Sequence, residues 1–253
     1  MTTLARETSP QVYARIGGVL YLIIIAVGLF GQTFVRGRLI VPGDATATAE
    51  KILSSESLLR GSIAAELFLL LTAAVVLALI FYVLLRPVSR NLALLAVLFN
   101  LVAITVEAVN KLNLLETLSL LANADYLRVL DPEQLHALAY LSAQSEGYGF
   151  GVSLIFFGCE CLILGYLIFR SGYLPKVVGV LMEIAGLCYL TNSFALIVSP
   201  SLAAQLVPAI LLPAFIGEAS LCLWLLVKGV NVSKWKARAS AKPASSALSG
   251  ALN

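Results

Sequence analysis

The chain has 253 residues, of which 60% are hydrophobic and only 12% are charged. Soluble domains carry about 25% charged residues, so this composition makes a soluble protein a poor fit and excludes a disordered or collagen-like chain. The net charge is +3. The basic residues gather at the ends of apolar segments, which is typical of membrane topology and not of nucleic-acid binding. We therefore expect a polytopic α-helical membrane protein whose first partner is the lipid bilayer.

Six apolar segments are long enough to cross a bilayer. A span needs about 20 residues, because the hydrocarbon core is about 30 Å thick and an α-helix rises 1.5 Å per residue. The first segment is too long for the core of a signal peptide and should remain as a span. The expected spans cover residues 12–35, 60–85, 91–121, 146–169, 174–197 and 205–228.

The connections between these spans are of two kinds. Residues 86–90 and 170–175 form short basic turns, whereas 36–57 and 122–145 are longer and carry soluble acidic residues. We expect a short surface helix after Asp44, a second one with Asp131 as N-cap and Pro132 as first residue, and Ser57 as N-cap of the second span. The sequence thus predicts one membrane domain, 1–232, and a disordered basic tail, 233–253.

Lysine and arginine are distributed unequally between the two sides of this topology. Eleven lie on the side of the two termini and five on the other, with Lys111 inside the membrane. By the positive-inside rule, both termini are expected in the cytoplasm, in agreement with an even number of spans. The predicted fold is a six-helix bundle in the cytoplasmic (inner) cell membrane. The five residues of the less basic side are Arg36, Arg38, Lys51, Arg60 and Arg128.

Half of the fourteen acidic residues are glutamates inside these apolar segments. A charged group at the centre of a span costs about 2.5–3.5 kcal/mol. Such groups usually face the interior of a bundle, are paired or protonated, and often mark a functional site. They are therefore the best functional indication in the sequence. The seven residues are Glu66, Glu107, Glu116, Glu146, Glu160, Glu183 and Glu218.

Their depth can be estimated from the nearest cytoplasmic base. Glu160 and Glu218 are each ten residues from one, about 15 Å along a helix and close to the midplane. Glu183 lies about 10 Å deep and Glu107 in the outer half. Left ionised and unpaired, these four would cost roughly 10 kcal/mol together. The other three, Glu66, Glu116 and Glu146, are expected near the outer boundary, within reach of water.

The third span offers one visible partner. Glu107 and Lys111 are four residues apart in the order that favours an ion pair, and Asn100 shares their helix face. Two interpretations stay open. The pair could neutralise itself and fix helix packing, or it could form one wall of a polar cavity.

The fourth span has two opposed faces. One carries glycines that would let another helix approach closely, and the other carries polar groups, as expected of a cavity-lining helix. The run from Glu146 to Gly149 could also kink or break this helix. The glycine face is Gly147, Gly151, Gly158 and Gly165; the polar face is Glu146, Gly149, Ser153 and Glu160.

The two remaining deep acids also have informative neighbours. Gly179 and Gly186 flank Glu183 on its own face, so we expect its carboxyl group to press against a neighbouring backbone. Pro213, five residues before Glu218, frees a backbone carbonyl that a polar group can use.

The sequence gives little support for metal or cofactor chemistry. His136 is the only histidine and lies in an outer connection, which excludes paired axial haem ligands and the zinc-protease helix motif. The four cysteines all lie in apolar segments without zinc or disulfide spacing and are expected to act as small apolar residues. Nucleotide-binding and serine-hydrolase motifs are absent. We therefore predict no cofactor and no metal site.

Five short motifs along the chain are informative together: 41–45 (VPGDA), 82–88 (YVLLRPV), 165–175 (GYLIFRSGYLP), 211–218 (LLPAFIGE) and 225–231 (LLVKGVN). As a set they resemble a bacterial multi-pass membrane family known only as domain of unknown function 4386. The resemblance runs from about Tyr13 to Asn231 and implies a membrane location, but no activity. Members of that family often carry histidine at the position of Glu160, which implies a polar group of variable chemistry there.

Three functions are compatible with these features. The first is a small transporter or ligand-binding bundle for a small molecule or a lipid, in which one or more carboxyls exchange protons. The second is a membrane enzyme that uses paired glutamates as general acid and base on a lipid-phase substrate. The third is a structural or accessory subunit whose polar residues specify helix pairing. The residues expected to line a polar cavity are Asn100, Glu107, Lys111, Ser153, Glu160, Glu183 and Glu218.

Overall fold

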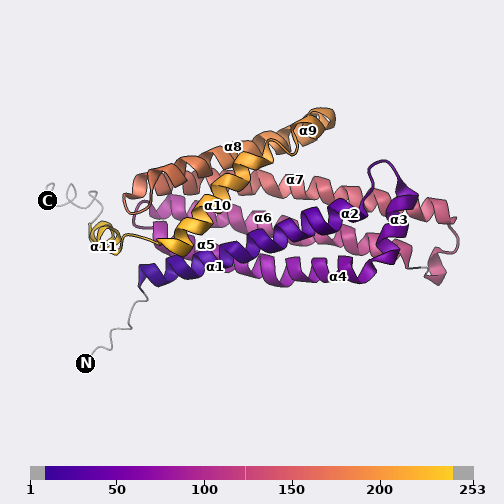
Figure 1. Cartoon of the computed structure of the whole chain (residues 1–253), viewed down its shortest axis with the longest axis horizontal. Helices are drawn as coiled ribbons and strands as arrows, with labels where there is room; N and C mark the ends of the chain where they lie inside the picture. Colours follow the sequence, from indigo (N-terminus) through magenta and orange to yellow (C-terminus); the bar gives the residue numbers. More distant parts are fainter. Residues whose placement is uncertain (1–8, 123, 242–253) are drawn as a thin grey trace, which may run out of the picture.

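The computed structural model describes residues 9–122 and 124–241, and within them every regular element is helical (Figure 1). Both described ends of the chain lie at the same end of the elongated molecule, where the last helix, α11 (Val232–Ser240), is found. We call this the α11 end. The opposite end carries α3 (Ala45–Ser54) and is called the α3 end.

Within the described residues, five helical stretches are long and apolar enough to cross a membrane, or six if one bent pair counts as a span. The bent pair is α9 (Pro200–Leu206) and α10 (Leu211–Val227), whose axes differ by 57°. The sixth predicted span is therefore not one straight helix. The five straight stretches are Pro10–Leu39, Glu56–Leu85, Arg90–Leu121, Pro132–Ser171 and Lys176–Val198.

Three of these stretches are single α-helices and two contain a π-helical segment. The single helices are α6 (Arg90–Leu121), α7 (Pro132–Ser171) and α8 (Lys176–Val198). The first stretch consists of α1 (Pro10–Leu29), the π-helix η1 (Phe30–Arg36) and α2 (Gly37–Leu39). The second consists of α4 (Glu56–Ala65), the π-helix η2 (Glu66–Leu70) and α5 (Leu71–Leu85).

The spans pack as a ring in the order of the chain. α1 packs against α5, α5 against α6, α6 against α7, and α7 against α8. The ring closes because α10 packs against both α8 and α1. This arrangement places the polar faces of several helices around a common interior.

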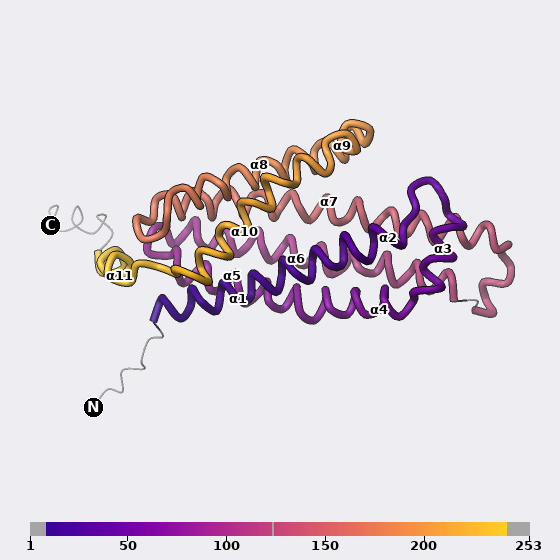
Figure 2. Tube along the Cα trace, viewed as in Figure 1, coloured from indigo at the N-terminus to yellow at the C-terminus, as the bar shows by residue number. Residues whose placement is uncertain are grey.

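The α7 helix is the main departure from the predicted elements. The sequence predicted a short surface helix at Pro132 and a separate span from residue 146, and left open a kink or break between Glu146 and Gly149. The structure has one continuous helix of 40 residues, about 60 Å long. It runs beyond the other spans at the α3 end (Figure 2). Two glycines in one turn did not break it, because it packs on α6 and α8 along its length.

The predicted helix caps are mostly confirmed. The Asp44 side chain accepts a hydrogen bond from the Ala47 N–H at 2.8 Å, and Asp131 forms a capping box with Gln134 ahead of Pro132. The prediction of Ser57 as N-cap was wrong, because α4 begins at Glu56 and Ser55 occupies its N-cap.

The described residues form two hydrophobic cores. The larger one fills the ring at the α11 end and includes Tyr21, Phe81, Leu164 and Leu225. The smaller one joins α3 and the beginning of α4 to the ends of α6 and α7 and includes Ile52 and Leu118. At 32 and 40 residues, α6 and α7 are both longer than the thickness of a bilayer core.

The glycine face of α7 is confirmed as a close-packing surface. A Cβ on Gly158 would lie 3.0 Å from the Gly186 oxygen, and a Cβ on Gly165 would lie 2.7 Å from the Gly179 oxygen. Both partners lie on α8. Gly147 departs from the prediction, because a Cβ there would meet no described atom within 4 Å.

The predicted disordered tail is in part a helix. The structure has α11 at Val232–Ser240, where the Asn231 side chain caps the Lys234 N–H. The Trp235 indole donates a hydrogen bond to the Leu84 oxygen at 2.9 Å, which fixes α11 against the last turn of α5. Residues 242–253 of the predicted tail lie outside the described residues.

Candidate functional site

A cavity of about 480 Å³ lies within the helix ring, with residues of all six ring members in its wall. Most of the wall is apolar, but polar residues gather at two places along it. One group lies where η1 and η2 face α6, and the other lies deeper, between α6, α7 and α10.

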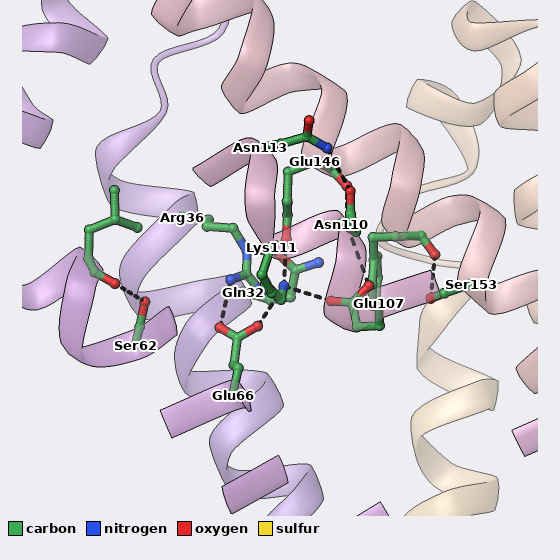
Figure 3. Close-up of polar contacts among 12 residues, drawn as sticks. Gln32, Arg36, Ser62, Glu66, Glu107, Asn110, Lys111, Asn113, Glu146 and Ser153 are labelled. Carbon is green, nitrogen blue, oxygen red and sulfur yellow. Dashed lines mark hydrogen bonds and ion pairs between the residues drawn. The ribbon is translucent and has the colours of Figure 1, made fainter. Parts of the chain in front are cut away.

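The first group is an ion network of five residues, shown in Figure 3: Arg36, Glu66, Glu107, Lys111 and Glu146. Its centre is the Lys111 ammonium, which lies 2.7 Å from Glu66 Oε2, 2.6 Å from Glu107 Oε1 and 2.8 Å from Glu146 Oε1. Lys111 is only 1% exposed. An ammonium group has three N–H donors, so these three carboxylates saturate it.

Arg36 is the second cation of the ion network. Its Nη1 lies 2.6 Å from Glu66 Oε1, its Nε donates to Gln32 Oε1 at 2.7 Å, and Nε also lies 3.5 Å from Glu146 Oε1. Glu66 therefore binds both cations, one with each carboxylate oxygen. Buried charges persist only when paired in this way, because an unpaired one is strongly destabilising.

Two π-helices position the Arg36–Glu66 pair. Arg36 is the last residue of η1 and Glu66 the first residue of η2. π-Helical turns interrupt the regular α-helical register and occur frequently at functional sites. A Cβ on Gly31 would overlap the Glu66 carboxylate, so glycine at this position in η1 leaves the space that the ion pair occupies.

An amide side chain braces the ion network on α6. Asn110 Nδ2 donates to the Glu146 backbone oxygen at 2.9 Å, and the Asn113 amide donates to Asn110 Oδ1 at 3.0 Å. A Cβ on Gly149 would overlap the Asn110 side chain. Gly149, predicted on the polar face of this helix, thus makes room for a polar partner from α6.

The second group contains Glu160 and Glu218, which we call the acid pair. Asn100 Nδ2 donates to Glu160 Oε2 at 2.8 Å. Tyr21 donates its hydroxyl to Glu218 Oε2 at 3.2 Å, and the Tyr189 hydroxyl donates to Glu218 Oε1. The described part of the chain places no cationic side chain within ion-pair distance of either carboxyl. All partners of the acid pair are thus neutral.

Aromatic rings surround the acid pair. Tyr21 and Phe81 meet edge to face with ring centroids 6.1 Å apart, and Phe157 and Tyr189 lie 5.4 Å apart. All four line the cavity. The carboxyl groups therefore lie between apolar and aromatic surfaces, where charge is far more expensive than in water.

Most of the predicted site residues meet at this cavity. Its wall contains six of the seven: Asn100, Glu107, Lys111, Ser153, Glu160 and Glu218. Ser153 is buried and donates its hydroxyl to the Phe150 oxygen at 2.9 Å.

The structure does not bring Glu183 to the cavity. Its side chain lies at the contact of α8 with α7, where a Cβ on Gly165 would meet it. This agrees with the predicted position against a neighbouring backbone. Glu183 was predicted as a member of the polar cavity, but it is not among the described residues that line the cavity.

Sequence reasoning missed three members of the ion network: Arg36, Glu66 and Glu146. Glu66 and Glu146 were expected within reach of water, yet they are only 3% and 2% exposed. One signal for this network was available in the sequence. Arg36 is a base at the end of an apolar segment, and Glu66 and Glu146 were predicted at a similar depth. Tyr21 and Tyr189 gave no signal, since tyrosine in a span is also a common interface residue.

The polar groups of the site are mainly carboxyl, amide and hydroxyl groups. Among the residues that the structure describes, no group of three or more His, Cys, Asp or Glu side chains could hold a metal ion. The arrangement can pair charges, accept hydrogen bonds and hold protons on the acid pair.

Comparison with known proteins places this architecture in a family. A family model described as "Domain of unknown function (DUF4386)" matches residues 16–229. A protein of Archaeoglobus fulgidus, named only as an uncharacterized protein, is 32% identical over 171 residues, which cover 66% of this chain and 84% of the relative. No solved structure matches the chain. The chain belongs to the DUF4386 family, an assignment in agreement with the motifs at both ends of its membrane region.

Proposed function

We propose that this protein binds a small molecule inside the membrane and carries it across, as a small transporter. The observation that carries the proposal is a cavity of about 480 Å³, of the size usual for small-molecule sites, that holds two carboxyl groups without a cation from the described chain. Ionisable groups at such a depth are costly and commonly mark substrate or proton pathways.

The ion network has a different role in this proposal. Three carboxylates saturate the Lys111 ammonium, and Arg36 is paired with Glu66 and lies 3.5 Å from Glu146, so both cations are neutralised within the ion network. They join η1, η2, α6 and α7 and thereby hold the helix ring together on the α3 side of the cavity. The structural interpretation of the buried glutamates thus suits this group, whereas the acid pair suits ligand binding.

The proposed orientation places the α11 end in the cytoplasm and the α3 end outside. Its support is the concentration of basic residues in the turns and the terminal helix at the α11 end, among them Arg86, Arg170, Lys176 and Lys228. The cell membrane is the proposed location. The enzyme alternative has no observation in its favour within residues 9–122 and 124–241.

The test is a ligand screen followed by a flux measurement. Purified protein in nanodiscs is heated with each member of a library of small organic compounds. A ligand at 100 times its Kd raises the unfolding free energy by about 2.7 kcal/mol. Each ligand is then loaded into proteoliposomes, and its counterflow is measured. We expect binding and flux in the wild type and in Glu183→Gln, and neither in Glu218→Gln.

Two outcomes would overturn the proposal. Ala103→Trp fills the cavity from α6, so a ligand that stabilises this variant as well as the wild type binds elsewhere. If a ligand binds in the cavity but shows no counterflow, the protein binds small molecules but does not transport them.

A further inference from the structure

The charge of the cavity wall favours a cationic ligand. Four acids and two bases line the cavity, and Glu146 joins the ion network from behind. The ion network uses three carboxylates for its two cations, and the acid pair adds two more carboxyls. Of the described ionisable side chains around the cavity, acids therefore exceed bases by three. A ligand carboxylate would meet repulsion here, whereas a ligand cation would meet attraction.

The hydrogen-bonding capacity of the deep group favours a ligand that donates. Asn100 is only 6% exposed and lines the cavity, and its amide nitrogen is used by Glu160. Its carbonyl oxygen, Asn100 Oδ1, is buried and finds no hydrogen-bond partner within the two described segments. A buried acceptor without a partner is destabilising, because it has lost its hydrogen bond to water. A donor from the ligand would remove this destabilisation.

The walls around these acceptors favour an apolar or aromatic ligand body. Tyr21 and Tyr189 contact Glu218, and Phe81 and Phe157 pack on these two tyrosines. The cavity continues along aliphatic residues such as Ile24 and Leu77. A cation within about 6 Å of an aromatic face is attracted to the ring, most strongly where water is excluded.

We infer that the ligand is a lipophilic ammonium ion with at least one N–H donor, held between Asn100 Oδ1, Glu160 and Glu218, with its apolar body along the aromatic wall. This inference rests on the proposed function and names its substrate class. The ammonium group supplies the missing charge and the missing donor at once, whereas a neutral alcohol supplies only the donor and a quaternary ammonium only the charge.

The test uses probes that share one aromatic body and differ in the polar group. They are 2-(2-naphthyl)ethylammonium, its N,N,N-trimethyl analogue, 2-(2-naphthyl)ethanol and 2-naphthylacetate. Binding to the full chain in zwitterionic nanodiscs is measured by equilibrium dialysis, with empty nanodiscs subtracted. We expect the primary ammonium to bind at least tenfold more tightly than the alcohol and the trimethyl analogue, and no saturable binding of the carboxylate.

A variant pair tests the role of Asn100. Asn100→Leu should remove the preference for the primary ammonium over its trimethyl analogue while leaving both as cationic ligands. Asn192→Leu is the matched control, because Asn192 Oδ1 on α8 is also buried without a described partner but does not line the cavity. It should keep the preference unchanged. Glu160→Gln should weaken both cations by at least tenfold.

The outcomes separate this inference from the proposed function. Tight binding of the alcohol or the carboxylate that Ala103→Trp abolishes would overturn the ammonium class and leave a small-molecule cavity in place. Ammonium binding that Asn100→Leu and Glu160→Gln do not alter would overturn the assigned position. Failure of all four probes, together with failure of the library screen on correctly folded protein, would overturn both.

Discussion

The ion network and the acid pair use the same residue type, in the same cavity, for opposite purposes. Three carboxylates of the ion network share Lys111 and Arg36 at distances of 2.6–3.5 Å. The two carboxyls of the acid pair receive hydrogen bonds only from neutral groups such as Asn100 and Tyr21. The partner rather than the residue thus decides the role. Carboxylates that are paired with a cation hold helices together, and carboxyl groups without a cation remain available to a ligand or a proton.

The largest loss of stability is expected when the ion network loses its central cation, Lys111. Lys111→Met leaves three buried carboxylates around one remaining cation. Breaking a buried ion pair from one side costs about 3–5 kcal/mol, so the variant should unfold at a much lower denaturant concentration. The measurement is an SDS titration of the detergent-solubilised protein, followed by circular dichroism.

Two further variants sharpen this result. Lys51→Met removes an exposed lysine of α3 and should leave the unfolding free energy almost unchanged. Adding Glu107→Gln to Lys111→Met removes one of the carboxylates that the first substitution leaves without a cation. The double variant should therefore recover part of the lost unfolding free energy. Equal stability of Lys111→Met and Lys51→Met would contradict a structural role for the ion network.

A smaller effect is expected from the glycine that accommodates Asn110. Gly149→Ala places a methyl group where the Asn110 side chain lies and should cost about 1–3 kcal/mol, as overpacking does. Gly147→Ala, two residues earlier on the same helix, meets open space and should be neutral or stabilising, because alanine is the better helix former. The same titration compares them, and equal destabilisation by both substitutions would contradict the packing argument.

A smaller change still is expected in the hydrogen bonds of the acid pair. Tyr189→Phe removes one donor to Glu218. Hydrogen bonds between membrane helices contribute about 0.6 kcal/mol on average, so the unfolding free energy should fall by about that amount. Ligand binding should change more than stability. Tyr166→Phe, at an exposed tyrosine of α7, is the control, and an equal change in both variants would argue against a specific bond.

The smallest effect on stability is expected for Glu160→Gln. Glutamine keeps an acceptor for Asn100, has nearly the same shape and carries no charge to desolvate. The protein should fold with unchanged stability and lose binding of its ligand. If this variant fails to fold, Glu160 has a structural role like the acids of the ion network, and the distinction between the ion network and the acid pair is wrong.

The fold was largely predictable because it depends on local properties. The length and composition of the apolar segments predict six spans, and five of them are straight in the described residues. The caps at Asp44 and Asp131 follow from side-chain chemistry. The continuity of α7 was not predictable, since Gly147 and Gly149 favour a break on local grounds and only packing on α6 and α8 opposes it. The bend between α9 and α10 was likewise not expected.

The candidate site was predictable only in part, because depth along one helix does not reveal partners on another. The spacing of Glu107 and Lys111 indicated their pairing. The same reasoning put Glu66 and Glu146 near water, although Arg36 and Lys111 from other helices allow them to be buried. Depth also does not reveal which side of α8 carries Glu183, and this residue does not line the cavity.

The unbroken α7 has a mechanical consequence. Glu146 of the ion network and Glu160 of the acid pair are fourteen residues apart on this single rod, about 21 Å along its axis. The same helix continues to the α3 end, where its beginning packs with α3 and the last turns of α6 in the smaller core. A tilt of α7 applied at the α3 end would therefore move both carboxylates together.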